Sequence, residues 1–305
     1  MPKISAVVSA FNEEENIVDC LSSLNWVDEI ILVDNSSQDN TVKLARQFGK
    51  KVKVFRRPNL PMLNINKNFG FSQASGEWIL NLDADERVSP PLKKEIQQTL
   101  SRPQADGYLI PRKNIIFGRW IRHGPWYPDE QLRLFRKGKG RFPEKHIHEK
   151  VVVKGKVGRL KHHLIHYNYR TVSQYLTKMT QIYVPAEVAA FLKKGKKVYW
   201  YDALRFPTQD FIKNFLALQG YKDGLHGLVL ALLQAFYQFL VLCHLWEKQG
   251  FRPFAPADFL DRTVLELKNT QRQLRYWLIQ QKPWPKIFKK VALKLNSLRT
   301  PRVPA

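Results

Sequence analysis

The chain has 305 residues, of which 44% are hydrophobic and 12% aromatic, and its formal net charge is +24. Such a basic chain indicates an anionic partner: nucleic acid, an acidic membrane surface or a phosphorylated substrate. Its two cysteines, Cys20 and Cys243, are far apart, which excludes a disulfide framework, argues against a zinc site and fits a reducing cytosolic setting.

The chain up to residue 90 alternates between strand and helix patterns. Apolar runs predict strands at residues 4–10, 29–33, 52–55 and 78–83. Between them, Asn12 and Ser37 are interpreted as helix caps, and a third helix is expected over 66–74. The first strand begins at once, without the apolar stretch and cleavage site of a signal peptide. The alternation predicts an α/β fold with a parallel sheet and ligands at the carboxyl ends of its strands.

The pattern changes after residue 100. Short strands at residues 107–111, 131–135 and 151–153 indicate an antiparallel extension that frames a site. From about residue 172 the chain is helical. We therefore expect three parts: a catalytic domain over 1–170, a helical, interfacial or membrane-associated region over 171–250, and a basic tail over 251–305.

Residues 228–246 contain no Asp, Glu, Lys or Arg. Their length is near the lower limit for a membrane span. However, Gln234, Gln238 and His244, with flanking aromatic and basic residues, suit a helix that lies in the membrane interface. A core helix packed on the catalytic domain is the third interpretation, and all three remain open.

The chain after Glu266 has ten basic residues and no acidic one. Trp277, Trp284 and Phe288 are interleaved with them. This composition suits binding to anionic lipid head groups or to nucleic acid. A solvated tail is the alternative.

Residues 78–86 run from an apolar strand into a cluster of carboxylates. In an extended segment Asp83 and Asp85 point the same way, and they repel each other unless a cation lies between them. Their hard oxygen ligands suit Mg or Mn, whose other ligands usually come from a phosphate. The alternative is a solvated acidic turn before a helix that Ser89 caps.

Polar groups also follow the other strand ends. Asp34 can accept hydrogen bonds from a base or a ribose, Lys67 can neutralise a phosphate, and the two aspartates can hold a metal. Together they predict a nucleotide-diphosphate site on one edge of the sheet. The sequence has no glycine-rich phosphate loop, which argues against hydride transfer or ATP hydrolysis.

With these elements the chain resembles the family 2 glycosyltransferases. Their GT-A fold is a Rossmann-like, mostly parallel sheet with helices on both faces. The matching segments, in the family's order and spacing, are residues 7–17, 33–41, 67–78 and 80–86. The resemblance covers about residues 1–247. It is closer to one branch, the lipopolysaccharide core glucosyltransferase-like proteins, through residues 118–121, 126–136, 148–149 and 223–227.

For the donor, the resemblance implies that Asn12, Glu14 and Asp34 hold the uridine. Lys67 would lie near the diphosphate. Asp83 and Asp85 would form the DxD motif, with Asp85 the more direct ligand of Mg or Mn. Ser9 stands where many members have Pro, and the QxxRW motif of processive members is absent, which implies addition of one sugar rather than a polymer.

For the chemistry, the resemblance implies that Asp129 is the catalytic carboxylate. It would take the proton of the acceptor hydroxyl in a single inverting displacement, for which a pKa raised by partial burial is expected. Glu130 and Glu149 are the competing candidates. The metal, with Lys67 or a downstream arginine, would stabilise the charge on the leaving diphosphate.

Further residues are candidates for the acceptor or diphosphate side. They are Trp126, Arg133, Arg136, His148 and Glu149. Trp120 and Trp126 offer flat faces for sugar stacking or simply anchor loops, and the arginines meet phosphates or cover a sheet edge. His146, His148 and His166 are interpreted either as a metal-ligand set or as ordinary surface and loop histidines.

The sequence therefore predicts a metal-dependent, inverting glycosyltransferase. Its donor would be UDP-glucose or a similar nucleotide sugar, and its acceptor a lipopolysaccharide core or another lipid-linked glycan. We expect it at the cytoplasmic face of the inner membrane, as a peripheral or monotopic protein on an anionic surface. One alternative is transfer to a polyprenyl phosphate. The other is a nucleic-acid-binding protein, against which the carboxylates at the strand ends argue because they repel phosphate unless a metal intervenes.

Overall fold

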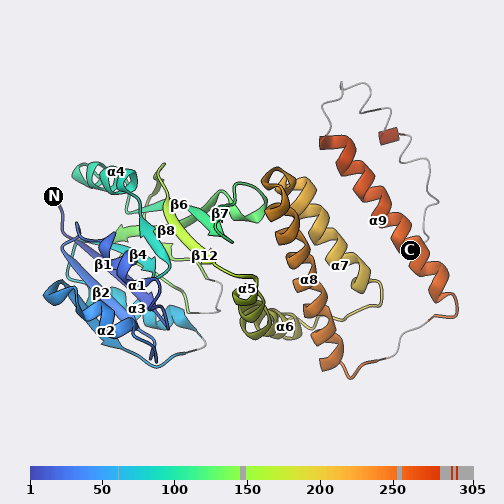
Figure 1. Ribbon diagram of the computed structural model, residues 1–305, viewed down its shortest axis with the longest axis horizontal. Helices are drawn as coiled ribbons and strands as arrows, with labels where there is room; N and C mark the ends of the chain where they lie inside the picture. Colours follow the sequence, from blue (N-terminus) through green and yellow to red (C-terminus); the bar gives the residue numbers. More distant parts are fainter. Residues whose placement is uncertain (61, 145–148, 253–255, 282–289, 291–292, 295–305) are drawn as a thin grey trace. The chain divides into compact units, whose positions relative to one another are not determined.

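The structure is a computed structural model that describes residues 1–60, 62–144, 149–252, 256–281, 290 and 293–294 (Figure 1). The chain forms two compact units. The sheet unit comprises Met1–Trp120 and Tyr127–Arg170, and the helical unit comprises Ile121–Trp126 and the chain from Thr171 onward. Ile121–Trp126 thus belongs to the helical unit although its neighbours in the chain on both sides belong to the sheet unit.

A ten-stranded mixed sheet organises the sheet unit. Its parallel part has the order β3 (Val52–Arg56), β2 (Glu29–Asp34), β1 (Ile4–Ala10) and β4 (Trp78–Asp83). Every residue of β1 is buried, as expected for a central parallel strand that is covered on both faces. The α/β class predicted from the strand–helix alternation is confirmed.

A mixed extension continues the sheet beyond β4. Its strands are β8 (Asp129–Arg136), β6 (Gly107–Ile116), β12 (Leu164–Tyr169) and β5 (Glu86–Val88), and β7 (Arg119–Trp120) and β11 (Val157–Arg159) pair with β6. The expected antiparallel arrangement is only partly correct, because β11 and β12 run parallel to β6. The strands expected over 107–111 and 131–135 lie within β6 and β8. The one expected over 151–153 corresponds to β10 (Val152–Val153), which pairs with β9 (Gly140–Arg141) outside the main sheet. Sequence analysis did not predict β12 or β5.

Helices cover both faces of the sheet. One face packs against α1 (Ile17–Ser22), α2 (Thr41–Arg46) and α4 (Pro90–Ser101), and the other packs against α3 (Leu63–Gln73). A short 3₁₀ turn, Gly49–Lys51, precedes β3. Ser89 caps α4 as predicted, because its side chain accepts a hydrogen bond from Leu92 N.

The two other predicted caps are wrong. α1 begins after Asn16 and α2 begins after Asn40. Asn12 and Ser37 instead join the loops that follow β1 and β2, because Asn12 N donates to Ser37 Oγ at 2.9 Å. These polar residues therefore serve contacts between loops, which local spacing does not reveal.

The helical unit begins with α5 (Val172–Lys178), a π-helical turn (Met179–Tyr183) and α6 (Val184–Lys193). α7 (Asp202–Phe211) continues into a second π-helical turn (Ile212–Ala217), and a 3₁₀ turn (Gly220–Asp223) leads into α8 (Leu225–Lys248). α9 (Phe259–Gln281) lies in the segment expected to be a tail. α7 lies between α8 and α9 and contacts both (Figure 1). Among the described residues, α8 alone is long and apolar enough to cross a membrane.

Candidate functional site

The parallel register brings the predicted site residues to one edge of the sheet. Ala10 lies opposite Asp34, and Ser9 lies opposite Asp83. The loops after β1, β2 and β4 therefore leave the sheet side by side. In a parallel α/β sheet, this carboxyl edge is where ligands bind.

The loops after β1 and β2 are tied together by the residues expected to hold uridine. Asn12 Oδ1 accepts from Gln38 N at 2.9 Å, and Glu14 Oε2 accepts from Asn40 N at 3.1 Å. Asp34 is fully buried and accepts from Ser37 N at 3.2 Å. Each of the three side chains thus has a structural contact, and their binding of a nucleotide stays a prediction.

Asp83 is held between two cations. Its Oδ1 lies 2.5 Å from Lys67 Nζ of α3, and its Oδ2 lies 2.6 Å from Arg133 Nη2 of β8. Burial opposes ionisation, but the charges of Arg133 and Lys67 and their hydrogen bonds outweigh it and hold the pKa of Asp83 well below its usual range. Both oxygens are already engaged by cations, so a metal at Asp83 would have to share this carboxylate with Lys67 and Arg133. Asp83 as a metal ligand therefore stays a prediction.

Arg133 is a buried bridge between two carboxylates. Its Nη2 also donates to Glu86 Oε1 at 2.7 Å, and Glu86 Oε2 accepts from Asp83 N at 3.0 Å. Glu86 is fully buried, so its charge depends on this partner. Arg133 was expected on the acceptor or diphosphate side. The structure places its buried guanidinium between Asp83 and Glu86 at the carboxyl edge of the sheet.

Arg136 lies elsewhere. β8 runs antiparallel to β4, with Arg136 opposite Trp78 and Leu134 opposite Leu80. Arg136 is thus at the amino-terminal end of β4, where its guanidinium stacks over the Trp78 ring and its Nε lies 3.6 Å from Asp106. This position, away from the carboxyl edge of the sheet, does not fit the expected contact with a phosphate, but it fits the alternative that Arg136 covers a sheet edge.

Asp129 lies in a cluster of hydrogen-bond donors. Arg112 Nε and Nη2 donate to its Oδ2 at 2.8 and 2.5 Å, Asn114 Nδ2 does so at 3.1 Å, and Gln131 Nε2 donates to its Oδ1 at 2.6 Å. Burial alone would raise the pKa of Asp129, but the charge of Arg112 and these hydrogen bonds lower it. The expectation of a raised pKa is wrong, because the sequence does not show that Arg112 faces this carboxylate.

His166 connects Asp129 to Asp85. Asn114 donates through Nδ2 to Asp129, so its Oδ1 faces His166 Nδ1 at 2.6 Å and that nitrogen carries the hydrogen. His166 Nε2 then points at Asp85 Oδ2, 3.4 Å away. Both side chains are largely buried. From the sequence, His166 is a candidate only in a set with His146 and His148, and those two lie outside the described residues.

These contacts form one continuous network. In order, it runs through Lys67, Asp83, Arg133, Glu86, Arg112, Asp129, Asn114, His166 and Asp85. It contains four carboxylates and three permanent cations, so one negative charge remains when His166 is neutral. A cation near Asp85 would balance that charge. Among the described residues no set of three His, Cys, Asp or Glu side chains surrounds a metal position, so such a cation would take further ligands from a substrate.

The remaining candidates lie apart from this network. Glu130 follows Asp129 on β8 and so points to the other face, where it pairs with Arg159 at 3.1 Å. Glu149 Oε2 accepts from Glu144 N at 2.7 Å and closes a loop. Trp120 is packed edge-on against the rings of Tyr127 and His163, which favours loop anchoring. The position of His148 is not among the described residues.

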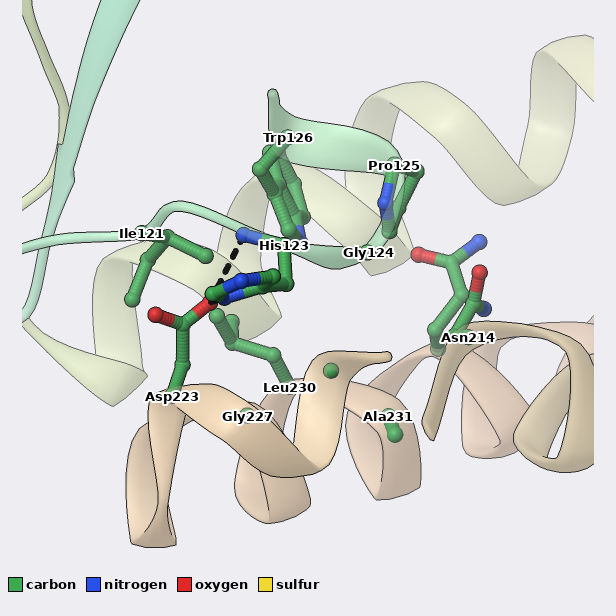
Figure 2. Close-up of a pocket in the computed structure, with 12 residues that line it drawn as sticks. Ile121, His123, Gly124, Pro125, Trp126, Asn214, Asp223, Gly227, Leu230 and Ala231 are labelled. Carbon is green, nitrogen blue, oxygen red and sulfur yellow. Dashed lines mark hydrogen bonds and ion pairs between the residues drawn. The ribbon is translucent and has the colours of Figure 1, made fainter. Parts of the chain in front are cut away.

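Trp126 belongs to the segment Ile121–Trp126, which Asp223 anchors within the helical unit (Figure 2). The Asp223 carboxylate is buried and accepts hydrogen bonds from Arg122 N at 3.1 Å and from His123 N at 2.8 Å. Gly124 N donates to Leu218 O at 2.9 Å. The segment that precedes Asp129 in the chain is thereby fixed at several backbone atoms.

Glycine is required beside this anchor. A Cβ on Gly227 would lie only 1.8 Å from Gly220 O, so the start of α8 can approach the turn before it only without a side chain there. The cavity between the segment and α8 measures about 10 Å³, which is enough for one water. The Asp223-to-Gly227 motif is therefore explained by packing rather than by a ligand pocket.

Comparison with known proteins gives the following. The family model described as "Glycosyl transferase family 2" matches residues 5–156. A lipopolysaccharide core biosynthesis glycosyltransferase, LpsC of Rhizobium meliloti (strain 1021), is 26% identical over 85% of this chain and 98% of its own length. An uncharacterized glycosyltransferase of Rickettsia felis is 31% identical over 81% of this chain and 90% of its own. The crystal structure of Staphylococcus aureus TarS 1-349 in complex with UDP is similar with a TM-score of 0.44 at 16% identity, covering 84% of this chain and 94% of that one.

We predict that Arg133→Met destabilises the chain by about 3–5 kcal/mol, because it leaves the buried Glu86 with only the longer contact to Arg112 and leaves Asp83 with Lys67 alone. Urea unfolding at pH 7 measures the loss. Arg136→Met on the same strand is the control and should cost less than about 1 kcal/mol, because its ion pair is partly exposed.

The pH dependence tests the same bridge. Because the pKa of Asp83 is depressed in the folded chain, its ion pairs stabilise the fold above the ordinary pKa of 3.8, and this stabilisation is lost as the pH falls through the lower, folded-state pKa. The difference between wild type and Arg133→Met should therefore narrow below pH 4, and equal costs for the two variants would contradict the buried bridge.

Asp223→Asn replaces one of the two accepting oxygens with an NH2 group, which donates and cannot accept. We expect a loss of about 1–3 kcal/mol in the stability of the anchored segment. Hydrogen exchange of the Arg122 and His123 amides should quicken accordingly. Asp261→Asn, an exposed change on α9, serves as the control, and unaltered exchange at both amides in Asp223→Asn would refute the anchor.

Proposed function

Because the chain belongs to glycosyl transferase family 2, we propose that it moves one sugar from a nucleotide-diphosphate sugar to a glycan acceptor with inversion at the anomeric carbon. The observation that carries the proposal is the continuous network from Lys67 to Asp85 at the carboxyl edge of the sheet. It places cations, an ionised carboxylate and a candidate metal pair along one edge. That combination suits displacement of a diphosphate.

On the donor side, Lys67 and Arg133 supply positive charge beside the strand end that carries Asp83. The uridine would lie against the loops after β1 and β2, where Asn12, Glu14 and Asp34 are found. UDP-glucose or a similar UDP-sugar is the donor we propose. The Asn12 and Glu14 side chains are exposed, so they are accessible to a nucleotide, whereas Asp34 would act by holding the turn at Ser37.

For a divalent cation the favoured position is at Asp85, because Asp83 is already held between two cations, and the His166 nitrogen beside Asp85 suits Mn better than Mg, which takes oxygen ligands. The Asp85 Oδ2 and His166 Nε2 atoms are 3.4 Å apart, a separation at which both can contact one cation with bonds of about 2.0–2.2 Å. When bound, the cation would offset the negative charge of the leaving diphosphate. The hydrogen bond from His166 Nδ1 to Asn114 fixes the tautomer in which Nε2 is able to coordinate.

Asp129 is the proposed base. The acceptor oxygen forms a bond to the anomeric carbon, the bond from that carbon to the diphosphate oxygen breaks, and the hydroxyl proton passes to Asp129. Asp129 is ionised at neutral pH, although its lowered pKa makes it a weaker base than a carboxylate whose pKa is raised. Arg112 and Asn114 orient it and join it to the Asp85–His166 pair. Glu130 is the weaker candidate, because it points to the other face of β8 and pairs with Arg159 there.

For the acceptor we propose a lipopolysaccharide core or another lipid-linked glycan. The support is the similarity to a lipopolysaccharide core biosynthesis enzyme over almost that enzyme's whole length. A lipid-linked acceptor requires a location at a membrane, and we propose the cytoplasmic face of the inner membrane with peripheral or monotopic attachment. Transfer to a polyprenyl phosphate would use the same donor site and is distinguished by acceptor assays.

The decisive experiment is a donor screen of UDP, GDP and ADP sugars with Mn or Mg, scored by release of the nucleoside diphosphate. Asp85→Ala and His166→Ala should each lose the metal-dependent part of UDP binding in calorimetry. Asp129→Asn should lower turnover by about 10²–10⁴-fold while Glu130→Gln stays near wild type. A wild-type chain that binds no UDP with either metal would end the proposal.

The pH profile tests the environment of Asp129. Its pKa is lowered mainly by Arg112 against the effect of burial, so the acidic limb of kcat/KM should lie below the ordinary value of 3.8. In Arg112→Gln burial is no longer opposed by that charge, and the limb should move up by about 1–3 pH units. Arg159→Gln, which removes the ion-pair partner of Glu130, is the matched control. An acidic limb of kcat/KM at the same pH in Arg112→Gln and wild type would show that another group is the base.

A further inference from the structure

α8 presents one continuous apolar stripe to the outside of the helical unit. Its exposed large residues are Leu225, Leu232, Phe236, Phe239 and Trp246. From Leu232 onward they are spaced by four, three and seven residues, so they lie on one side of the helix. Residues 228–246 carry no charged side chain. The stripe extends over most of a helix about 36 Å long.

The opposite side of α8 is packed on protein. Its buried residues include Leu230, Ala231, Val241, Leu242 and Leu245, and the helix contacts α6 and α7. The helix is thus buried along one side and exposed along the other over its whole length. A helix that crosses a bilayer beside α7 would place the polar side chains of that neighbour in hydrocarbon, which is unfavourable. The arrangement suits a helix that lies along a surface.

α9 has its polar side turned inward. Its single buried residue is Glu266, which forms a two-pronged ion pair with Arg205 of α7 at 2.5 and 2.8 Å. A groove of about 300 Å³ between α7 and α9 is lined by polar side chains, and Gln281 bonds to Tyr221 and Leu216. Meanwhile Leu260, Leu267 and Leu278 are about half exposed or more. This distribution is the opposite of the one that water favours, because in water burial of the leucines rather than of Glu266 would be favourable.

The charge of this part of the chain indicates what covers these apolar side chains. Lys268 and Arg275 are exposed on α9, seven residues apart and next to the apolar positions. From Lys268 to Arg302 the sequence has ten basic residues and no acidic one. An apolar stripe beside exposed basic side chains complements a surface that is apolar inside and anionic outside.

We propose that the outward faces of α8 and α9 dock on an anionic lipid bilayer, with α8 lying in the interface rather than across it. This inference deepens the membrane location in the proposed function and does not depend on the reaction. The side chains of Leu232, Phe236 and Phe239 enter the boundary between head groups and acyl chains. Lys268 and Arg275 remain at the level of the lipid phosphates.

The test uses the full chain and vesicles of phosphatidylcholine with about one third phosphatidylglycerol, compared with pure phosphatidylcholine, in flotation assays. The triple change Leu232→Ser, Phe236→Ser and Phe239→Ser should weaken partitioning at least about tenfold. A matched control changes three exposed valines of the sheet unit, Val18, Val152 and Val157, to Ser and should bind as wild type. Lys268→Ala with Arg275→Ala should weaken binding to the anionic vesicles only.

The depth of α8 in the bilayer is measured by fluorescence quenching of the Phe239→Trp variant, in the middle of the helix, by lipids brominated at shallow or deep acyl positions. Quenching should be stronger with the shallow bromines, and stronger quenching by the deep ones would overturn the interfacial position in favour of a span. Equal partitioning of wild type and the triple variant would overturn the docking face. The single change Phe236→Ser, at an exposed position, gives a second reading if the triple variant does not fold.

Two further measurements separate the alternatives. A concentration-dependent dimer of wild type without lipid, lost in the triple variant, would assign the stripe to self-association and overturn the lipid proposal. Release of UDP from the donor, assayed without vesicles, reports on the proposed reaction alone. Vesicle binding without any turnover would therefore refute the glycosyltransferase mechanism and leave the docking surface standing.

Discussion

The buried guanidinium of Arg133 is the interaction on which the rest of the site depends. It comes from an antiparallel strand and binds Asp83 at the end of β4 and Glu86 at the start of β5. Without it, the fully buried Glu86 would lie next to the partly exposed Asp83 with no cation between them. Its charge keeps Asp83 ionised, and Glu86 in turn reaches Arg112, the partner of Asp129. One buried cation thereby links both ends of the proposed reaction.

This arrangement divides the work within the Asp-x-Asp motif. Two aspartates one residue apart on an extended strand would be equivalent if only the strand mattered. In the folded chain, Asp83 meets Lys67 and Arg133 while Asp85 meets His166. Asp83 is therefore held between two cations, whereas Asp85 lies beside a histidine. The difference arises because Asp83 is the last residue of β4, whereas Asp85 lies in the turn between β4 and β5.

The helical unit distributes its apolar and charged side chains differently from the sheet unit. In the sheet unit, apolar side chains such as Trp78 and Phe135 are fully buried and charges are paired at the edge. In the helical unit, α9 buries Glu266 and exposes leucines, and α8 exposes an uncharged stripe. The hydrophobic effect accounts for both if the first unit is surrounded by water and the second meets lipid on one side. The basic residues after Glu266 are consistent with the same surroundings.

The sequence by itself determined the α/β class, the parallel strands with polar residues at their ends and the family, because these depend on periodicity and on short motifs whose residues are close in the chain. Ser89 as a cap of α4 is of the same kind. Only the tertiary structure decided that Arg112 lowers the pKa of Asp129, that His166 rather than Asp83 accompanies Asp85, and that Arg136 lies at the far end of β4. Those outcomes depend on how β6, β8 and β12 pair with strands tens of residues away, and a charged side chain does not reveal in advance which partner it will face.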